Sequence, residues 1–298
     1  MRVDPNYITN LSGSLSQSSY AEQQLTNELS SGLRIAQLSD DPVAAAQNAL
    51  FSNAINRLDS FTQSSTTEQG KLQVADSTLG QVVTQITSAI SLATSAGNGT
   101  LNASNLSSIA TELGGIRDQV LSLANTSYQG QYLFSGSQGS TEPFTLNGST
   151  TPTTVTYNGD SLTQSVQTPA GQSIQVNVPG SAIFTNPSAN LLGTLNQLIT
   201  DVAAGNNTAV AADSTNLSAA LTNVSTQRAV LDSSLSQLTS TSTYATTQAT
   251  QLTAQQSALI SADPATVATQ LQTAEVQHQA LLSVISAVGK SDLFSYIQ

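Results

Sequence analysis

The chain has 298 residues, of which 8% are charged and 4% aromatic, and its formal net charge is −11. It contains no cysteine, which excludes disulfides, thiol catalysis and zinc–thiolate sites. Its seven Lys and Arg residues are scattered and form no basic patch, and no apolar run approaches the length of a membrane span, so the sequence argues against nucleic-acid and membrane partners. With so few large side chains, the composition favours long helices packed along thin apolar seams.

The N-terminal segment predicts a helix. Positions from residue 8 to residue 29 step by three and four, as in a heptad seam, and Ser18 and Glu22 interrupt it. The apolar positions of this seam are Ile8, Leu11, Leu15, Leu25 and Leu29. Gly32 follows the last of them and predicts the end of the helix.

A second helix is expected to begin at Asp41–Pro42, and it continues into a 3.5-residue repeat that runs from Leu72 to Ala93. The Gly- and Asn-rich residues 95–104 predict a turn. A third helix with the same spacing then spans 106–123, so the two helices form an antiparallel hairpin.

Residues 136–189 change character, because Gly and Pro become frequent and β-branched residues alternate with polar ones. The stretch 153–168 predicts a hairpin of two strands joined by an Asn-Gly turn at Asn158–Gly159. A further short strand is expected within 172–180, and we predict a small β insert of about four strands.

The chain is helical again from about Asn190. From Leu217 to Leu259 every step between seam positions is three or four residues, which predicts a long coiled coil. Arg228 lies on this seam and is expected to set its register or to form an ion pair. Asp263–Pro264 breaks this helix. The last helix is expected to end near Gly289, and its seam includes Leu271, His278, Leu281, Ile285 and Val288.

The predicted fold is therefore mainly α with a small β insert, in which the N- and C-terminal halves form a long coiled-coil helical rod. We predict that residues 1–41 and 262–298 form an inner assembly core from the terminal helices. Residues 42–140 and 190–261 form the helical rod and hairpin, and residues 141–189 form an outward-facing β insert.

The adjacent carboxylates Asp40 and Asp41 are the first candidates for chemistry. Neighbouring residues on a helix or strand point in different directions, so they seldom converge on one ligand, and no His or Glu cluster supports them. A capping role explains them better: Asp41 is a good N-cap, Pro42 suits the first helical position, and Asp40 adds negative charge near the positive end of the helix dipole.

No other residue pattern predicts catalysis. His278 is the only histidine, and its place in an apolar seam favours a polar contact between packed helices. The sequence contains no nucleophile-elbow, phosphate-loop, dinucleotide or zinc-protease motif, so we expect neither an enzyme nor a cofactor or metal. The terminal seams instead indicate association, and we expect the terminal segments to be loose in the free chain and to become ordered when subunits stack.

Four separated stretches carry a family resemblance. They are MRVDPNYI at the start, SSGLRIAQLSDDPVAAAQ at residues 30–47, IRDQVLSLANTSYQGQYLFSG at 116–136 and LFSYIQ at 293–298. In this order they resemble the flagellin superfamily. The Ser-Asp-Asp-Pro form at residues 39–42 and the tail resemble its hook–filament junction branch more than flagellin, which usually follows the acid pair with alanines.

The resemblance implies a structural protein of the extracellular bacterial flagellum, exported by the flagellar type III apparatus without a cleaved signal. Implied partners are further copies of the chain in a ring, a neighbouring hook-associated protein, flagellin, and an export chaperone on the C-terminal helix. The terminal helices would form the inner tube. The implied assembly residues are the seam positions named above together with Arg34, Asp40, Leu293 and Phe294.

Two alternatives remain at this stage. One is flagellin itself, the filament subunit, which shares the fold but occupies a different place. The other is a surface adhesin whose binding module is the β insert.

Overall fold

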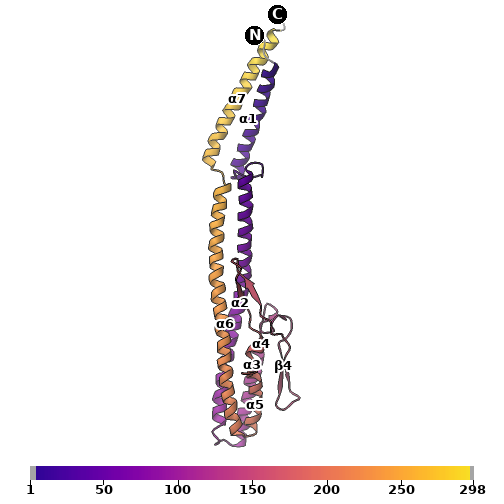
Figure 1. The fold of residues 1–298 in the computed structure, drawn as a ribbon, viewed down its shortest axis with the longest axis vertical. Helices are drawn as coiled ribbons and strands as arrows, with labels where there is room; N and C mark the ends of the chain where they lie inside the picture. The colour runs from indigo at the N-terminus through magenta and orange to yellow at the C-terminus, as the bar shows by residue number, and fades with distance from the viewer. Residues whose placement is uncertain (1–4, 296–298) are drawn as a thin grey trace. The chain divides into compact units, whose positions relative to one another are not determined.

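The computed structural model describes the backbone of residues 5–295 and the side chains of residues 9–287 (Figure 1). The chain divides into two compact units. Residues 1–56 and 248–298 form the terminal unit, and residues 57–247 form the central unit. The helices α2 (Pro42–Ala96) and α6 (Asn207–Ile260) each contribute one part to each unit.

The terminal unit contains α1 (Pro5–Ser31), α7 (Pro264–Ser295), the start of α2 and the end of α6. Helices α1 and α7 pack against each other in antiparallel directions (Figure 1). In the same unit the Gln256 side chain of α6 donates hydrogen bonds to Asn48 Oδ1 and Ser52 Oγ of α2, both at 2.7 Å. The predicted terminal helices are present, but α7 continues through Gly289 to Ser295, so the expected end near Gly289 was wrong. An interior glycine weakens a helix by only about 1 kcal/mol relative to alanine, which does not stop it.

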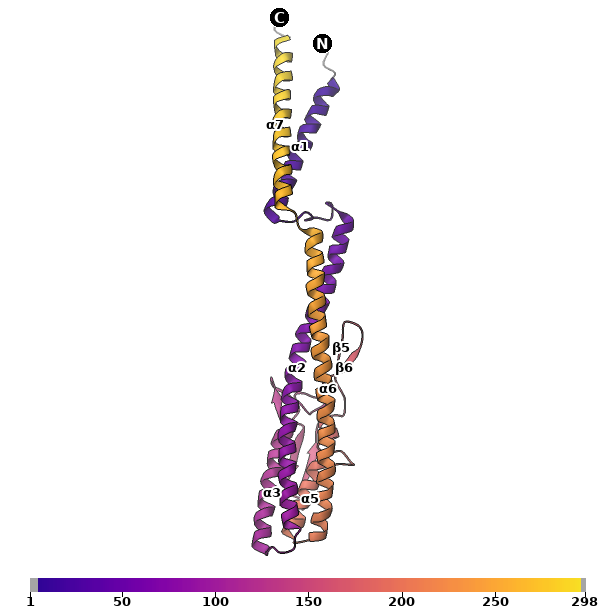
Figure 2. The same ribbon diagram turned by 90° about the vertical axis from the view of Figure 1, so that its left-hand side faces the viewer.

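The central unit adds α3 (Ala103–Ala124), α4 (Gly180–Ile183) and α5 (Leu191–Ala203). Asn102 and Asn190 cap α3 and α5 through their side chains, which accept hydrogen bonds from backbone amides of the first turns. Helices α3 and α5 pack together and lie beside the C-terminal part of α2 and the N-terminal part of α6 (Figure 2).

Much of the core of the central unit lies along the predicted seams, whose fully buried side chains include Leu72, Leu79, Val82, Ile86, Leu113, Val120, Leu217 and Val224. Helix α5, for which no seam was predicted, adds Leu195 and Leu198. On α6, every predicted seam position from Leu217 to Leu259 is buried or half-buried. The heptad spacing therefore located the packed face of this helix correctly.

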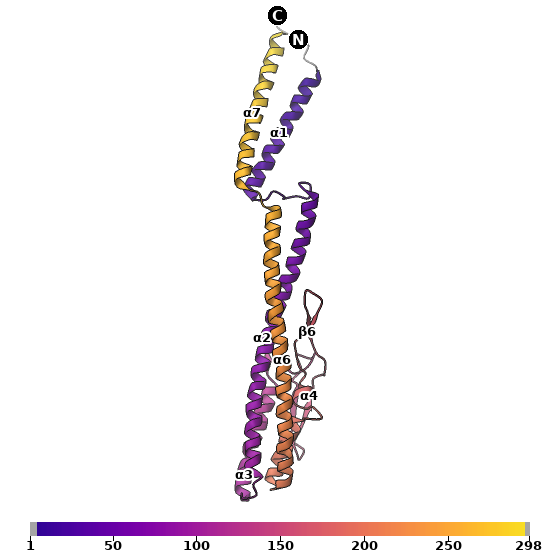
Figure 3. The same ribbon diagram turned by 60° about the vertical axis from the view of Figure 1, so that its left-hand side comes forward.

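Residues 127–189 lie along one side of the helices of the central unit (Figure 3). They form three separate two-stranded antiparallel sheets, in which β1 pairs with β2, β3 with β4 and β5 with β6. The strands are β1 (Ser127–Tyr128), β2 (Gln131–Tyr132), β3 (Phe144–Asn147), β4 (Thr154–Tyr157), β5 (Ser165–Gln167) and β6 (Ser173–Gln175). Within this segment Phe134, Phe144 and Phe184 are buried, and Phe184, at the end of α4, makes edge-to-face ring contacts with the other two.

The predicted hairpin across Asn158–Gly159 was wrong, since β4 and β5 do not pair. The chain after β4 instead docks on the loop that follows β2: the Asp160 amide donates to the Ser135 carbonyl at 3.2 Å, and the Asp160 carboxylate accepts from the amide and hydroxyl of Ser137. A Cβ at Gly159 would lie 2.7 Å from the Ser135 carbonyl oxygen, so this glycine allows a close approach of two chain segments.

The fold class is thus confirmed: the chain is mainly α, with a small β insert made of short hairpins.

Candidate assembly surface and its joint

The segment between α1 and α2, residues 32–41, holds three of the charged residues that the sequence singled out, namely Arg34, Asp40 and Asp41. We call it, with residues 261–263, the joint. Gly32 has φ +69° and its amide donates to the Glu28 carbonyl at 2.8 Å, so it ends α1 as predicted.

The two segments of the joint, residues 32–41 and residues 261–263, are hydrogen-bonded to each other. Leu33 and Ser261 form an isolated antiparallel bridge, the Arg34 amide donates to the Ile260 carbonyl at 2.8 Å, and the Ala262 amide donates to the Gly32 carbonyl at 2.9 Å. The segment that leaves α1 is therefore paired with the segment that enters α7.

Arg34 reinforces this pairing with its side chain. Its Nη2 donates to the Leu259 carbonyl at 3.0 Å, in the last turn of α6, where free carbonyls and the helix dipole favour a cation. A second nitrogen, Nη1, lies 4.0 Å from Asp41 Oδ2, and about half of the side chain stays exposed. Arg34 thus contacts both α6 and the start of α2 within the terminal unit.

Asp40 and Asp41 have separate roles. Asp40 Oδ2 accepts from the amides of Ala36 and Gln37 at 3.0 and 2.8 Å, so it closes the turn before α2. Asp41 Oδ1 accepts from the amides of Val43 and Ala44 at 3.1 and 3.0 Å, which are the contacts of an N-cap, and Pro42 is the first residue of α2. The capping prediction for Asp41 and Pro42 fits this geometry, whereas Asp40 acts on the turn.

The start of α7 has the same kind of N-cap as the start of α2. Asp263 precedes Pro264, and its carboxylate accepts from the Thr266 hydroxyl at 2.7 Å and from the Ala265 amide at 3.1 Å. These hydrogen bonds, that from Thr266 first, hold the pKa of Asp263 below its ordinary value. Both helices that leave the joint therefore begin with an Asp-Pro cap.

The predicted seam positions lie between α1 and α7. Half-buried members are Leu11, Leu15, Leu25, Leu271, Leu281 and Ile285, while Leu29 is 40% exposed. His278 is half-buried, with Nδ1 3.9 Å from Glu22 Oε2. The side chains of Ile8, Val288, Leu293 and Phe294 lie outside those that the structure describes.

A second apolar face on α7 was missed by the sequence interpretation. Val276 is 66% exposed and Val284 41% exposed, and the exposed Ala280 lies between them at the same four-residue spacing. Val276 follows the buried Val267 by nine residues, about two and a half turns, so it points away from α1. We call Val276, Ala280 and Val284 the back face of α7. Their four-residue spacing is visible in the sequence, but the sequence interpretation considered only the longer seam that contains Leu271 and Val288.

Other exposed apolar residues of the terminal unit lie on α1, in the joint, on the first turns of α2 and on α7. They include Tyr20, Leu38, Val43 and Leu50, each 68–70% exposed, and Leu282, which is 46% exposed. Near the joint, a groove of about 170 Å³ is lined mainly by polar residues of α1 and of residues 33–40. In the part of the chain whose side chains are described, most strongly exposed apolar residues therefore belong to the terminal unit.

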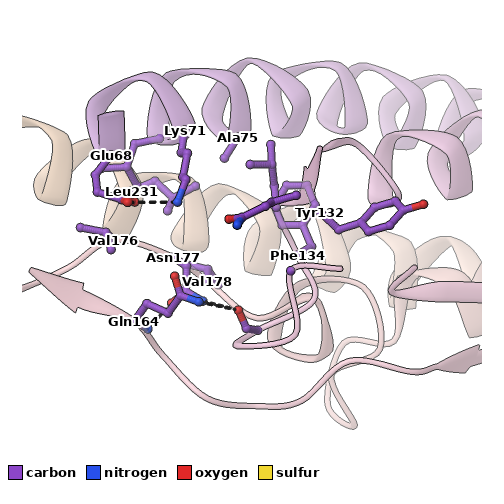
Figure 4. Close-up of a pocket in the computed structure, with 15 residues that line it drawn as sticks. Glu68, Lys71, Ala75, Tyr132, Phe134, Gln164, Val176, Asn177, Val178 and Leu231 are labelled. Atoms are coloured by element: carbon purple, nitrogen blue, oxygen red, sulfur yellow. Dashed lines mark hydrogen bonds and ion pairs between the residues drawn. The ribbon is translucent and has the colours of Figure 1, made fainter. Parts of the chain in front are cut away.

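In the central unit, a small cavity of about 40 Å³ with a mixed polar and apolar lining lies between α2, α6 and the β segment. Figure 4 shows Glu68 and Lys71 of α2 facing Asn177 across it, with Lys71 Nζ 3.0 Å from Glu68 Oε1. Its volume suits a few water molecules and excludes a typical ligand. Arg228, the predicted ion-paired seam residue, binds Asp76 of α2 through Nε and Nη2 at 2.8 and 3.1 Å.

Within the described residues there is no group of three or more His, Cys, Asp and Glu side chains that could hold a metal ion. No helix in that part of the chain is both long enough and apolar enough to cross a membrane. The features that remain are packed terminal helices with an additional exposed apolar face.

Two family models identify the class of protein to which these paired terminal helices belong. The model of the bacterial flagellin N-terminal helical region matches residues 6–139, and that of the bacterial flagellin C-terminal helical region matches residues 214–297. Together they cover well over half of the chain, which therefore belongs to the flagellin family.

Within that family, two curated relatives carry the name flagellar hook-associated protein 3. The protein from Salmonella typhimurium is 32% identical over 185 residues, and that from Escherichia coli K12 is 33% identical over 190. Each match covers 62% of this chain and 56% or 57% of the relative, so the matched part spans little more than half of those proteins.

Solved structures agree on the fold. The flagellar junction protein FlgL from Legionella pneumophila superposes with a TM-score of 0.57 at 17% identity, over 72% of this chain and 99% of that one. Bacillus cereus FlgL gives 0.57 at 21% identity, over 70% of this chain and 99% of that one. At these identities the likeness supports the fold and leaves function to other observations.

Proposed function

We propose that this chain is a structural subunit of the bacterial flagellum that joins the hook-associated ring to the flagellin filament. Membership of the flagellin family and the names of the two curated relatives support this role. The observation that carries it in this chain is the two-sided α7, which packs on α1 with one face and exposes an apolar stripe on the other.

The back face suits subunit packing. Apolar residues exposed at regular helical spacing typically cover a partner helix, and burying two valines stabilises a contact by roughly 2–4 kcal/mol. The role is architectural and requires no catalysis. The proposed partners are other copies of the chain in a ring, a neighbouring hook-associated protein and flagellin. An export chaperone would cover α7 before secretion through the type III apparatus.

The proposed assembly residues fall into three groups. The seam residues Leu11, Leu15, Leu25, Leu29, Leu271, His278, Leu281 and Ile285 hold α1 and α7 as one surface, and the back face contacts the neighbour. Arg34 and Asp40 set the joint, so they act on assembly by orienting the terminal helices. Loss of Arg34 should therefore impair assembly more than it lowers the melting temperature.

The back face supplies the sharpest test. A double substitution V276S/V284S should leave the helix content of the purified chain unchanged, because both side chains are exposed. In a strain that lacks the wild-type gene, however, this variant should fail to support filaments and should release flagellin into the medium. The matched control is L162S, since Leu162 is 60% exposed but belongs to the β segment. Normal filaments with V276S/V284S would contradict the proposal.

A shortened chain tests the C-terminal helix as a whole. Removal of about 30 C-terminal residues should leave a soluble, largely folded chain that cannot assemble, because α6 and the core of the central unit remain. Assembly of this fragment would count against packing through α7.

A further inference from the structure

Three Asn-Gly pairs occur in the chain, at Asn98–Gly99, Asn147–Gly148 and Asn158–Gly159. The side-chain carbonyl carbon of an asparagine, Cγ, is open to attack by the backbone nitrogen of the next residue. Glycine permits this attack best, because it has no Cβ to crowd the nitrogen and its backbone rotates freely. The sequence does not distinguish the three pairs, but the structure gives them different surroundings.

Asn158–Gly159 is held in place. The Asn158 side-chain amide donates to the Glu142 carbonyl and to Thr145 Oγ1, both at 3.3 Å, and its backbone amide donates to the Pro143 carbonyl at 2.8 Å. Gly159 makes the close approach to the loop after β2 that is described above. Attack on Asn158 therefore requires a local opening that breaks these contacts.

Asn147–Gly148 lies at the open end of the β3–β4 hairpin, and its backbone nitrogen is free. Pairs along an antiparallel ladder alternate between hydrogen-bonded and non-hydrogen-bonded. The first pair, Phe144 with Tyr157, is non-hydrogen-bonded, because the residues that flank it bond to each other, so the fourth pair, Asn147 with Thr154, is hydrogen-bonded. The amide of Gly148, the next residue, then points away from β4. Asn147 is exposed, and a Cβ at Gly148 would have no atom within 4 Å.

The local backbone also activates the Asn147 carbonyl. The Ser149 amide donates to Asn147 Oδ1 at 3.1 Å. Attack on Cγ moves electrons onto this oxygen, and an N–H donor already fixed on it stabilises the negative charge that develops there. Asn158 instead uses its side-chain nitrogen as a donor. Asn98, exposed in the turn after α2, accepts no such hydrogen bond from the described residues.

We propose that Asn147 is a site of spontaneous deamidation in the folded chain. The Gly148 nitrogen loses its proton to a base in the solvent and bonds to Asn147 Cγ. The Cγ–Nδ2 bond breaks, and Nδ2 takes up a proton and leaves as ammonia. Water then opens the resulting succinimide ring at either carbonyl and gives aspartate or isoaspartate. Both products add a negative charge to the hairpin tip. The inference concerns the central unit and does not depend on the proposed function.

The test incubates the full chain in mildly alkaline buffer, once folded and once in guanidinium chloride, and follows each Asn-Gly peptide by proteolysis and mass spectrometry. In denaturant the three pairs should react at similar rates. In the folded chain Asn147 should react at least as fast as in denaturant. Asn158 should react about ten-fold more slowly when folded, because local opening must come first.

Three variants separate the proposed chemistry from simple exposure. S149P removes the N–H donor, so it should slow the reaction at Asn147 in the folded chain and not in denaturant. G148A should slow it in both, because a Cβ crowds the attacking nitrogen. The matched control T150A removes a hydroxyl that contacts the Asn147 backbone carbonyl and should react like the wild type. Equal rates at Asn147 and Asn158 in the folded chain would overturn the proposal, and so would a wild-type rate in folded S149P.

Discussion

Asp213 offers the clearest quantitative prediction. It lies on α6 at 6% exposure, its Oδ2 has no hydrogen-bond partner among the described residues, and Asp201 of α5 is near. Burial, and secondarily the Asp201 carboxylate, raise the pKa of Asp213 from 3.8 to about 6. A raised carboxyl pKa means that the folded state binds the proton more tightly than the unfolded state, so stability falls as the pH rises from about 4 to about 6 and stays lower above it.

The shift of about two pKa units corresponds to roughly 3 kcal/mol. D213N removes the charge and keeps the shape, so it should stabilise the central unit at pH 7.5 by up to about 3 kcal/mol and have little effect at pH 4. Urea unfolding followed by circular dichroism at both pH values measures this, with E112Q, an exposed acid on α3, as the control. Destabilisation by D213N at pH 7.5, or an equal gain at both pH values, would refute the reasoning.

Substitutions at three further sites test local features by the same unfolding measurement. D41A should destabilise the terminal unit by about 1 kcal/mol because it removes the α2 cap, while D41S should retain most of the stability; equal loss from both would exclude capping. G70A would place a Cβ 2.6 Å from Tyr128 Oη, so this contact should cancel most of the roughly 1 kcal/mol that alanine gains over glycine inside a helix, and adding Y128F should recover part of that gain; a full gain in G70A alone would refute the close contact. Q129N should stabilise the β1–β2 turn by roughly 0.5 kcal/mol, because Gln129 has φ +50° and asparagine tolerates this region better; a loss would show that the Gln129 side chain matters.

The helices were predictable because their information is periodic. Every seam position from Leu217 to Leu259 is buried or half-buried. The end of α1 and the starts of α2 and α7 followed from the local chemistry of Gly32, Asp41 and Asp263. Such signals need only the neighbouring residues of the same helix, so a single sequence carries them.

The β insert and the back face were not predictable in this way. Asn158–Gly159 is a strong turn pattern, but its outcome depended on the loop at Ser135 and Ser137, more than twenty residues earlier in the chain. The back face was visible as a spacing, but whether Val276 and Val284 are covered depends on which face α1 occupies. The role of Arg34 at the end of α6 likewise required the pairing of residues 225 positions apart.

The most direct test of the proposed junction role is deletion of the gene in its own bacterium, followed by electron microscopy of the cell surface and measurement of flagellin in the medium. A junction subunit predicts cells that build hooks, lack filaments and release flagellin monomers, with filaments restored by the wild-type gene. Normal filaments in the deletion strain would contradict the account. Loss of filaments without released flagellin would identify the chain as the filament subunit itself.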